Sequence, residues 1–271
     1  MRFLAGLALT VALSTVAVVA QAPAGPQAGG GRGRGAQGPP PAPRAAAPFD
    51  PVGYWVSVVT EDWRWRMVTP QKGDYPGVPM TPAARQVADS WDLAKDKANG
   101  DECKAFGAAG LIRIPMRMHI TWQDDNTLKI DTDAGQQTRQ LHFGGTPPAA
   151  GERTWQGYST AEWYKQPQAA GLGFGGGGGR GVAGGNLRVV TSNMKAGYLR
   201  KNGVPYSENA VLTEYINRHD EPNGDHWLMF TSVIDDPKYL NQPFILSTSF
   251  KQEADGSKFH PTPCEIDPPR N

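Results

Sequence analysis

The residues with the clearest chemical potential lie in the segment 53–67, GYWVSVVTEDWRWRM. Tryptophan and arginine alternate there, at positions Trp63, Arg64, Trp65 and Arg66. In a strand this alternation would place the two tryptophans on one face and the two arginines on the other. A buried arginine requires a partner of opposite charge. That partner is either an acidic ligand or, as the simpler hypothesis, an internal carboxylate such as Glu61, Asp62 or Glu214.

Further polar residues extend this candidate site, because they lie in or beside segments with the alternating pattern of strands. The predicted ligand-binding residues are Trp63, Arg64, Trp65, Arg66, Arg117, His119, Tyr198, Arg200 and Glu214. We expect the last three at the mouth of a cavity. Pockets for small molecules are mostly apolar and carry a few fixed polar groups. The expected partner is therefore a small, partly apolar molecule of unknown identity, and an acidic one if the arginines contact it.

Two other classes of function fit the same residues. Arginine, histidine and carboxylate around a dry cavity could perform acid–base chemistry on a small anion, as in cofactor-independent isomerases and lyases. No spacing in the sequence selects an enzyme, so the catalytic residues are unknown and we favour a non-enzymatic binder. A cell-envelope interaction module is the third hypothesis, because it would suit a long tether and a glycine-rich loop. We expect no cofactor.

Metal and nucleotide sites have weak support in the sequence. His119 and His142 are expected on neighbouring strands and could bind zinc with Glu214 if the three side chains converged. Separate packing of each histidine is the simpler hypothesis, so we expect no metal site. The segment 171–185 contains GxGxxG, but no strand before it, helix after it or later acidic residue supports a dinucleotide site. We expect a disordered surface loop at about residues 167–185.

The elements that must position these residues are mostly β-strands. Residues 54–59 and 63–69 are expected to form a first hairpin across the turn 60–62. One substantial helix is expected between the N-cap Thr81 and Gly100, with Trp91 as the anchor of its apolar stripe. Residues 154–164 could be strand or helix. Further strands are expected at 116–123, 127–132, 137–143, 187–192, 211–218, 227–234 and 244–250.

These elements indicate an all-β fold with one substantial helix. Successive short strands joined by short turns close most economically into an antiparallel up-and-down barrel, which also removes exposed sheet edges. Barrels of about eight to ten strands leave room inside for one small molecule. We therefore expect a lipocalin-like barrel with the ligand in its interior.

The start of the chain has the features of a secretory signal peptide. Arg2 precedes an apolar run with small residues near Ala20, so residues 1–20 are expected to be removed. Residues 21–48 are rich in proline, glycine and alanine and are expected to be a disordered linker. Residues 49–271 are expected to form a single β-barrel domain. The mature protein should be exported, to the periplasm or beyond, without a membrane span.

The cysteines and the charges agree with export. The two cysteines, Cys103 and Cys264, are expected to form a disulfide, because disulfides persist in oxidising compartments. The formal net charge is +1. The folded part is slightly acidic, because several arginines precede residue 49, namely Arg2, Arg32, Arg34 and Arg44. Such a domain lacks the basic footprint of a nucleic-acid-binding protein. The oligomeric state is unknown.

A resemblance supports the fold. The segments that carry it are GYWVSVVTEDWRWRM, MHITWQDDNTLKIDTDAG, GYLRKNGVPYSENAVLTEY and VIDDPKYLNQPF. Over most of residues 50–264 the chain resembles a group of uncharacterised exported bacterial proteins. The last two segments are also similar to parts of lipocalin-like barrel proteins of unassigned function. The resemblance implies a β-barrel, and it implies no activity, cofactor or catalytic residue.

Overall fold

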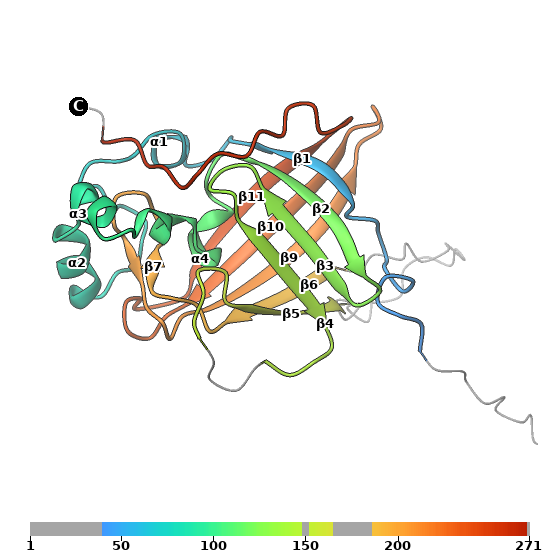
Figure 1. Cartoon of the computed structure of the whole chain (residues 1–271), viewed down its shortest axis with the longest axis horizontal. Helices are drawn as coiled ribbons and strands as arrows, with labels where there is room; N and C mark the ends of the chain where they lie inside the picture. The colour runs from blue at the N-terminus through green and yellow to red at the C-terminus, as the bar shows by residue number, and fades with distance from the viewer. Residues whose placement is uncertain (1–39, 148–151, 165–185, 270–271) are drawn as a thin grey trace, which may run out of the picture. The chain divides into compact units, whose positions relative to one another are not determined.

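Nine strands close into a barrel in the computed structural model of the chain (Figure 1). The structure describes residues 40–147, 152–164 and 186–269. The predicted signal peptide, most of the predicted linker and the glycine-rich segment lie outside these residues. The strand order around the barrel is β1-β11-β10-β9-β6-β5-β4-β3-β2. The strands are β1 Gly53–Val58, β2 Arg117–Asp124, β3 Thr127–Thr132, β4 Thr138–Phe143, β5 Tyr158–Tyr164, β6 Asn186–Ser192, β9 Val211–Asp220, β10 His226–Asp235 and β11 Phe244–Glu253.

The predicted strands after residue 115 are confirmed, and each agrees with the structure to within a few residues. The undecided stretch 154–164 contains β5. The expectation of a purely antiparallel barrel is wrong at one place, because β4 and β5 pair in parallel. The chain therefore returns to the end of the barrel where β4 began before β5 starts. The barrel is mixed, and a specifically lipocalin-like topology is not established.

Inward-facing side chains fill the barrel. Alternate residues of every strand point inward, as the period of a strand requires. The largest fully buried side chains of the strands are Trp55, Met118, Ile120, Leu128, Leu141, Leu187, Leu212, Phe230 and Phe250. Among them lies one buried ion pair, between Arg139 of β4 and Glu214 of β9. The interior is thus a packed core in which Thr191 accepts a hydrogen bond from Arg139 at 3.3 Å and is bonded to Ser159 at 2.7 Å.

The predicted first hairpin is wrong. Residues Trp63–Arg66 form a short helix, α1, instead of a return strand. The neighbours of β1 in the barrel are β2 and β11, so no free edge remains for a strand from this segment. Asp62 has a φ of 52°, in the left-handed region that aspartate tolerates, and it turns the chain into α1.

The single long helix is also wrong, because the chain forms two short helices, α2 at Pro82–Asp89 and α3 at Leu93–Ala98. The Thr81 hydroxyl accepts a hydrogen bond from the Ala84 N–H at 3.2 Å, which confirms the predicted N-cap. A second cap interrupts the helix, since the Asp92 carboxylate accepts from the N–H groups of Ala94 and Lys95. Trp91 lies in the break and is buried.

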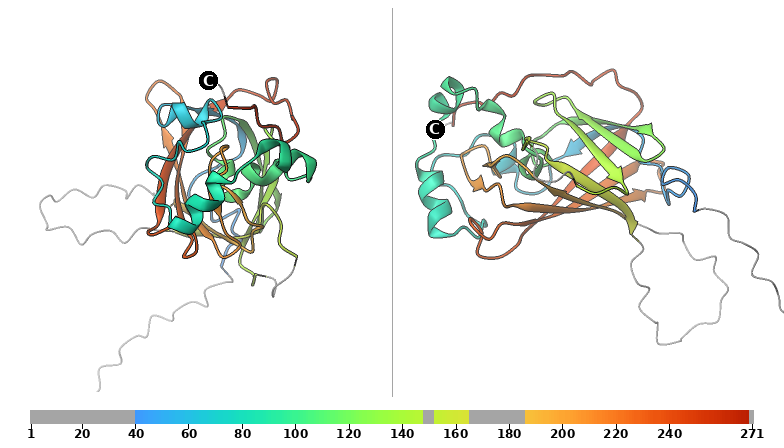
Figure 2. Two further views of the ribbon diagram at one scale, coloured as in Figure 1. Left: turned by 90° about the vertical axis from the view of Figure 1, so that its left-hand side faces the viewer. Right: turned by 60° about the horizontal axis from the view of Figure 1, so that its bottom comes forward.

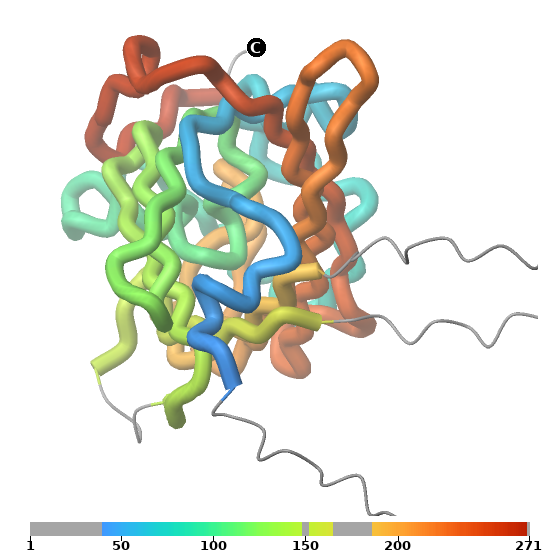
Figure 3. The backbone as a smooth tube through the Cα atoms, turned by 90° about the vertical axis from the view of Figure 1, so that its right-hand side faces the viewer, coloured from blue at the N-terminus to red at the C-terminus, as the bar shows by residue number. Residues whose placement is uncertain are grey.

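The helices gather over one end of the barrel, which we call the helical end (Figures 1 and 2). They are joined there by the 3₁₀ helix η1 Glu102–Phe106, by α4 Ala108–Leu111 and by the small sheet of β7 Gly197–Tyr198 and β8 Pro205–Tyr206. Figure 3 shows the barrel from the opposite end, with the segment that leads into β1 in blue. There Pro43 accepts a hydrogen bond from the Trp163 indole at 2.7 Å, so the last part of the predicted linker contacts the barrel.

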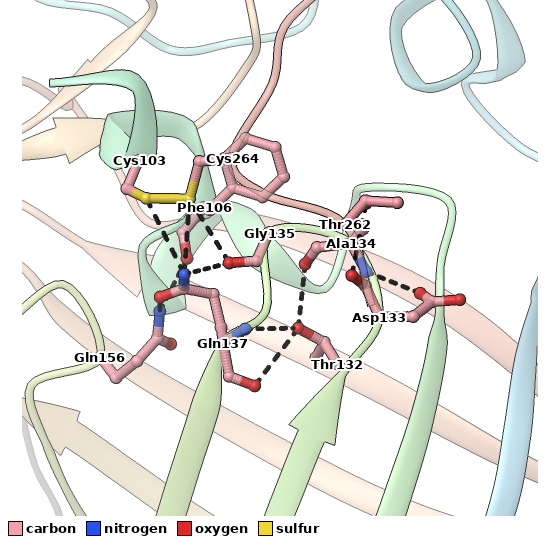
Figure 4. The surroundings of a disulfide bond; sticks show 10 residues. All are labelled: Cys103, Phe106, Thr132, Asp133, Ala134, Gly135, Gln137, Gln156, Thr262 and Cys264. Atoms are coloured by element: carbon pink, nitrogen blue, oxygen red, sulfur yellow. Dashed lines mark hydrogen bonds between the residues drawn. A yellow bond between two sulfur atoms is a disulfide. The ribbon is translucent and has the colours of Figure 1, made fainter. Parts of the chain in front are cut away.

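A C-terminal strap, residues 254–264, returns from the end of β11 to the helical end (Figure 1). Along its course Phe259 packs edge-on against the stacked rings of Tyr54 and His119. The strap then reaches the predicted disulfide, Cys103–Cys264, which is confirmed (Figure 4). The disulfide thereby joins η1 to the strap beside the turn between β3 and β4. Among the described residues, no helix has both the length and the apolarity needed to cross a membrane.

Candidate functional site

A cluster of three arginines and two carboxylates lies at the helical end. We call it the arginine cluster, and its members are Glu61, Asp62, Arg66, Arg113 and Arg200. Glu61 and Asp62 lie between β1 and α1, and Arg66 ends α1. Arg113 follows α4, and Arg200 follows β7. The two pieces that carry Arg113 and Arg200 touch closely, because a Cβ on Gly110 would meet the Tyr198 carbonyl oxygen at 2.4 Å.

Arg66 is buried, with 2% of its surface exposed. Its Nη1 donates to Glu61 Oε1 at 2.5 Å, and its Nε donates to the Arg113 carbonyl oxygen at 2.9 Å. Burial of this side chain explains why α1 forms where a strand was expected. The helix sends Arg66 inward and leaves Trp63 with 66% of its surface exposed.

Arg113 is the most fully bonded member of the cluster. Its Nη1 donates to Glu61 Oε1 at 3.1 Å and to the Ser247 carbonyl oxygen at 2.6 Å. Its Nη2 donates to Asp62 Oδ2 at 2.6 Å. The two carboxylates are therefore shared between Arg113 and Arg66, as the hypothesis of an internal ion network requires.

Arg200 differs from the other two arginines. Its guanidinium lies 4.7 Å from the centre of the Trp65 ring, a distance that favours a cation–π contact. The loop that carries Arg200 packs tightly against Trp91. Gly203 (φ 82°) in this loop lies so close to Trp91 that a Cβ there would clash. Arg64 lies on the outer side, with most of its side chain exposed, and pairs with Asp74 at 2.8 Å.

The cluster borders a cavity of about 30 Å³. Its polar wall contains Asp62, Trp65, Arg66, Arg113, Arg200 and Lys201. Its apolar wall contains Ala105, Ile114, Leu199, Phe244 and Leu246. Within the described part of the chain, three buried donor atoms of the polar wall lack a hydrogen-bond partner: Trp65 Nε1, Arg66 Nη2 and Arg200 Nη1. Buried donors are nearly always satisfied in folded proteins, so three of them around one cavity call for an explanation.

Burial acts on the pKa values of the arginines and of the Glu61 carboxylate in opposite directions. Burial lowers the pKa of Arg66 to about 10, and the nearby charge of Arg113 acts in the same direction. Burial likewise lowers the pKa of Arg200 to about 10. Burial alone would raise the pKa of Glu61, but a hydrogen bond from Thr60 and the charges of Arg66 and Arg113 hold that pKa below its ordinary value. Positive charge thus compensates the Glu61 carboxylate, whereas burial outweighs the charges of Asp62 and Asp74 at Arg200.

The structure brings together only part of the predicted site. Trp65, Arg66 and Arg200 line the cavity. Trp63 and Arg64 lie on the exposed side of α1. Glu214 is inside the barrel and pairs with Arg139.

The remaining predicted site residues lie elsewhere. Arg117 pairs with Glu253 at 2.8 Å. His119 stacks on Tyr54 with ring centres 4.0 Å apart. Tyr198 lies at the helical end, but its hydroxyl donates to Asp96 at 2.9 Å.

The zinc hypothesis required His119, His142 and Glu214 to converge. His142 stacks on Tyr158, on the outside of the barrel, and Glu214 points inward. The three side chains therefore do not meet.

Arg113 bonds both carboxylates of the cluster but was not among the predicted site residues. A signal was present, since Arg113 is a lone charge among apolar residues, in the run Leu111, Ile112, Arg113 and Ile114. A charged residue in such a run is either exposed or paired inside the protein.

No family model, curated protein or solved structure matches the chain. The resemblance to exported bacterial proteins therefore stays an expectation, and the β-barrel that it implied is confirmed.

Proposed function

We propose that this protein binds a small, partly apolar ligand through an acidic group, in the cavity of the arginine cluster. One observation carries the proposal. Trp65, Arg66 and Arg200 border the same cavity, and each has a buried donor atom without a partner among the described residues. An acidic group can accept hydrogen bonds from all three, and charge-assisted hydrogen bonds are the strong ones.

The internal carboxylates account for only part of the cluster. Glu61 and Asp62 bond Arg66 and Arg113, and neither forms an ion pair with Arg200 within 4 Å in the described structure. Hydrogen-bonded ion pairs therefore account for two of the three arginines, whereas Asp62 and Asp74 act on Arg200 from beyond ion-pair distance. The apolar wall of the cavity supports the second half of the proposal, because pockets for small molecules are mostly apolar with a few polar groups.

The position of the proposed site differs from the expected one. We expected a ligand in the middle of the barrel, but packed side chains fill that space, and the cavity lies under the helices. The Cys103–Cys264 disulfide ties down η1, which supplies Ala105 to the cavity wall. A disulfide is compatible with an exported protein, and export remains part of the proposal.

Native mass spectrometry tests this function. The mature protein, purified from the exported fraction of its own cells, should carry a mass surplus that disappears on denaturation. The variant Arg200→Gln should lose the surplus, because the unpartnered guanidinium is gone. The control variant Arg188→Gln should keep it, because Arg188 pairs with Glu162 on the outside of the barrel. A bare polypeptide in the wild type, or an unchanged surplus in Arg200→Gln, would contradict the proposal.

A further inference from the structure

The charges around the cavity do not balance. The cluster contains three cations, Arg66, Arg113 and Arg200, and two carboxylates, Glu61 and Asp62. The excess of one positive charge remains when the charged residues next to the cluster are included. Arg64 pairs with Asp74, and Asp267 acts on Lys201, so each added cation comes with one added carboxylate. Both counts leave one more positive than negative charge, and Arg200, on which Asp62 and Asp74 act from beyond ion-pair distance, is the arginine of the cluster that no carboxylate bonds in the described structure.

We propose that a single monocarboxylate with a short apolar body compensates this charge. The inference rests on the proposed function and adds the chemical class of the ligand. A carboxylate carries one negative charge and two oxygens that each accept more than one hydrogen bond. Its charge equals the excess of the cluster, and its oxygens can accept from the nitrogens of Arg66, Arg200 and Trp65 that lack partners.

The size of the cavity agrees with a carboxylate head. A buried water requires about 10–15 Å³ of such volume. The cavity of about 30 Å³ therefore holds two or three atoms of that size, which corresponds to the three heavy atoms of a carboxylate. The carbons beyond the head exceed this volume, so we expect the side chains of Leu199, Phe244 and Leu246 to move apart and cover them.

Other anions fit less well. A phosphate or sulfate dianion would turn an excess of one positive charge into an excess of one negative charge, and a buried charge without a partner is costly. A halide would balance the charge but leave the apolar wall without a contact. A water molecule could accept from some of the donors, but it would leave the charge uncompensated.

Calorimetric titration of the full mature protein separates these possibilities. The probes are sodium butyrate, chloride, sulfate and phosphate, at pH 8 and at constant ionic strength. We expect butyrate to bind with one-to-one stoichiometry, at least about tenfold more tightly than any of the inorganic anions. Arg200→Met should abolish butyrate binding, and Arg188→Gln should leave it unchanged.

A second variant tests the charge count itself. Asp62→Asn keeps the shape of the side chain and suits the positive φ of this position, since asparagine also tolerates the left-handed region. It raises the excess from one positive charge to two. We expect the preference to move towards sulfate by about tenfold relative to the wild type, which corresponds to 1.4 kcal/mol.

The binding results distinguish a failure of the proposed function from a failure of the monocarboxylate proposal. If no carboxylate and no inorganic anion binds, the proposed function and this inference are both overturned. If sulfate or phosphate binds the wild type more tightly than butyrate, the acidic-ligand function stands and the monocarboxylate is overturned. Chloride that binds as tightly as butyrate would also overturn it, because the apolar wall would then contribute nothing.

Discussion

Two buried arginine sites in this protein differ in how their charge is compensated. Inside the barrel, Arg139 faces Glu214 as a fork, with Nη1 and Nη2 donating to the two carboxylate oxygens at 3.1 and 2.5 Å. At the helical end, three arginines share two carboxylates. Arg66 and Arg113 are buried like Arg139, but Glu61 and Asp62 each keep 35% of their side-chain surface exposed. The pair in the barrel is matched charge for charge, although Arg139 Nε also lacks a hydrogen-bond partner among the described residues. The arginine cluster has one more positive than negative charge, and its unpartnered donors belong to residues that line a cavity.

The comparison shows how a structural ion pair can be told from a binding site. A matched bidentate pair has no charge left for a ligand and holds two strands together. An unmatched cluster is a cost to the folded protein unless a ligand contributes the missing charge. The two sites should therefore respond in opposite ways when one charge is removed.

Removal of one partner inside the barrel should have the largest effect. Glu214→Gln leaves the guanidinium of Arg139 buried without a counter-charge, so we expect a loss of about 3–5 kcal/mol in the free energy of unfolding. Chemical denaturation measures this loss. The control is the double variant Arg139→Met with Glu214→Leu, which removes both charges and should recover most of the stability. A single variant as stable as the wild type would show that the pair is not buried as described.

Loss of the disulfide should have the next largest effect, and it should fall on the helical end. The double variant Cys103→Ala with Cys264→Ala frees the strap and η1, and we expect a loss of about 2–5 kcal/mol. Hydrogen exchange should rise in η1 and in residues 254–264 and change little in the strands around Arg139 and Glu214. Equal loosening of both regions would mean that the disulfide stabilises the barrel as a whole.

Removal of the unmatched arginine should cost little stability. Arg200→Met loses a cation–π contact with Trp65, worth about 0.5–2 kcal/mol, but it also relieves the positive excess. We expect a net change below about 1 kcal/mol in the free energy of unfolding, together with loss of carboxylate binding. Parallel denaturation and titration measure both. A loss as large as that of Glu214→Gln would show that Arg200 belongs to a structural network.

The smallest effect concerns His119, which belongs neither to the Arg139–Glu214 ion pair nor to the arginine cluster. Burial lowers the pKa of His119, although the charge of Asp131 opposes the shift and Lys129 supports it. The unfolded chain then binds the proton more tightly than the folded one. This stability is therefore complete above the ordinary pKa of 6.5 and decreases as the pH falls through that range.

Unfolding midpoints at pH 5 and pH 8 would measure this dependence on pH. His119→Phe keeps a flat ring between Tyr54 and Phe259 and should show a smaller difference between the two pH values. An unchanged difference in this variant would assign the pH dependence to other groups.

Most of the barrel strands were predictable because their alternating pattern is visible within each segment, whereas β5 was not distinguished from a helix. β3, for example, alternates with Leu128 and Ile130 inward and Lys129 and Asp131 outward, and its bounds agree with the prediction. The parallel contact of β4 with β5 was not predictable, since it depends on which strands become neighbours when the barrel closes. Residues 63–66 have the alternating pattern of a strand but lie outside the sheet, because β2 and β11 already pair with both edges of β1.

The candidate site was partly predictable for a related reason. The sequence shows which residues are chemically unusual, and three of those named for the site, Trp65, Arg66 and Arg200, line one cavity in the structure. The sequence does not show which of these side chains contact one another in the fold. Arg113 was overlooked because its role depends on α4 packing against β7. His119 and Glu214 were included because the inward face of each strand was undetermined.

The most direct test of the account is the indole N–H signal of Trp65 in a nitrogen–proton correlation spectrum during a butyrate titration. Trp65→Phe identifies the signal. We expect a saturable downfield shift of the Trp65 signal, because its Nε1 has no partner in the described structure. The indoles of Trp55 and Trp163 should stay in place, since they already donate to the carbonyl oxygens of Pro51 and Pro43. An unmoved Trp65 signal, or equal shifts at all three tryptophans, would contradict the claim that this cavity receives an acidic ligand.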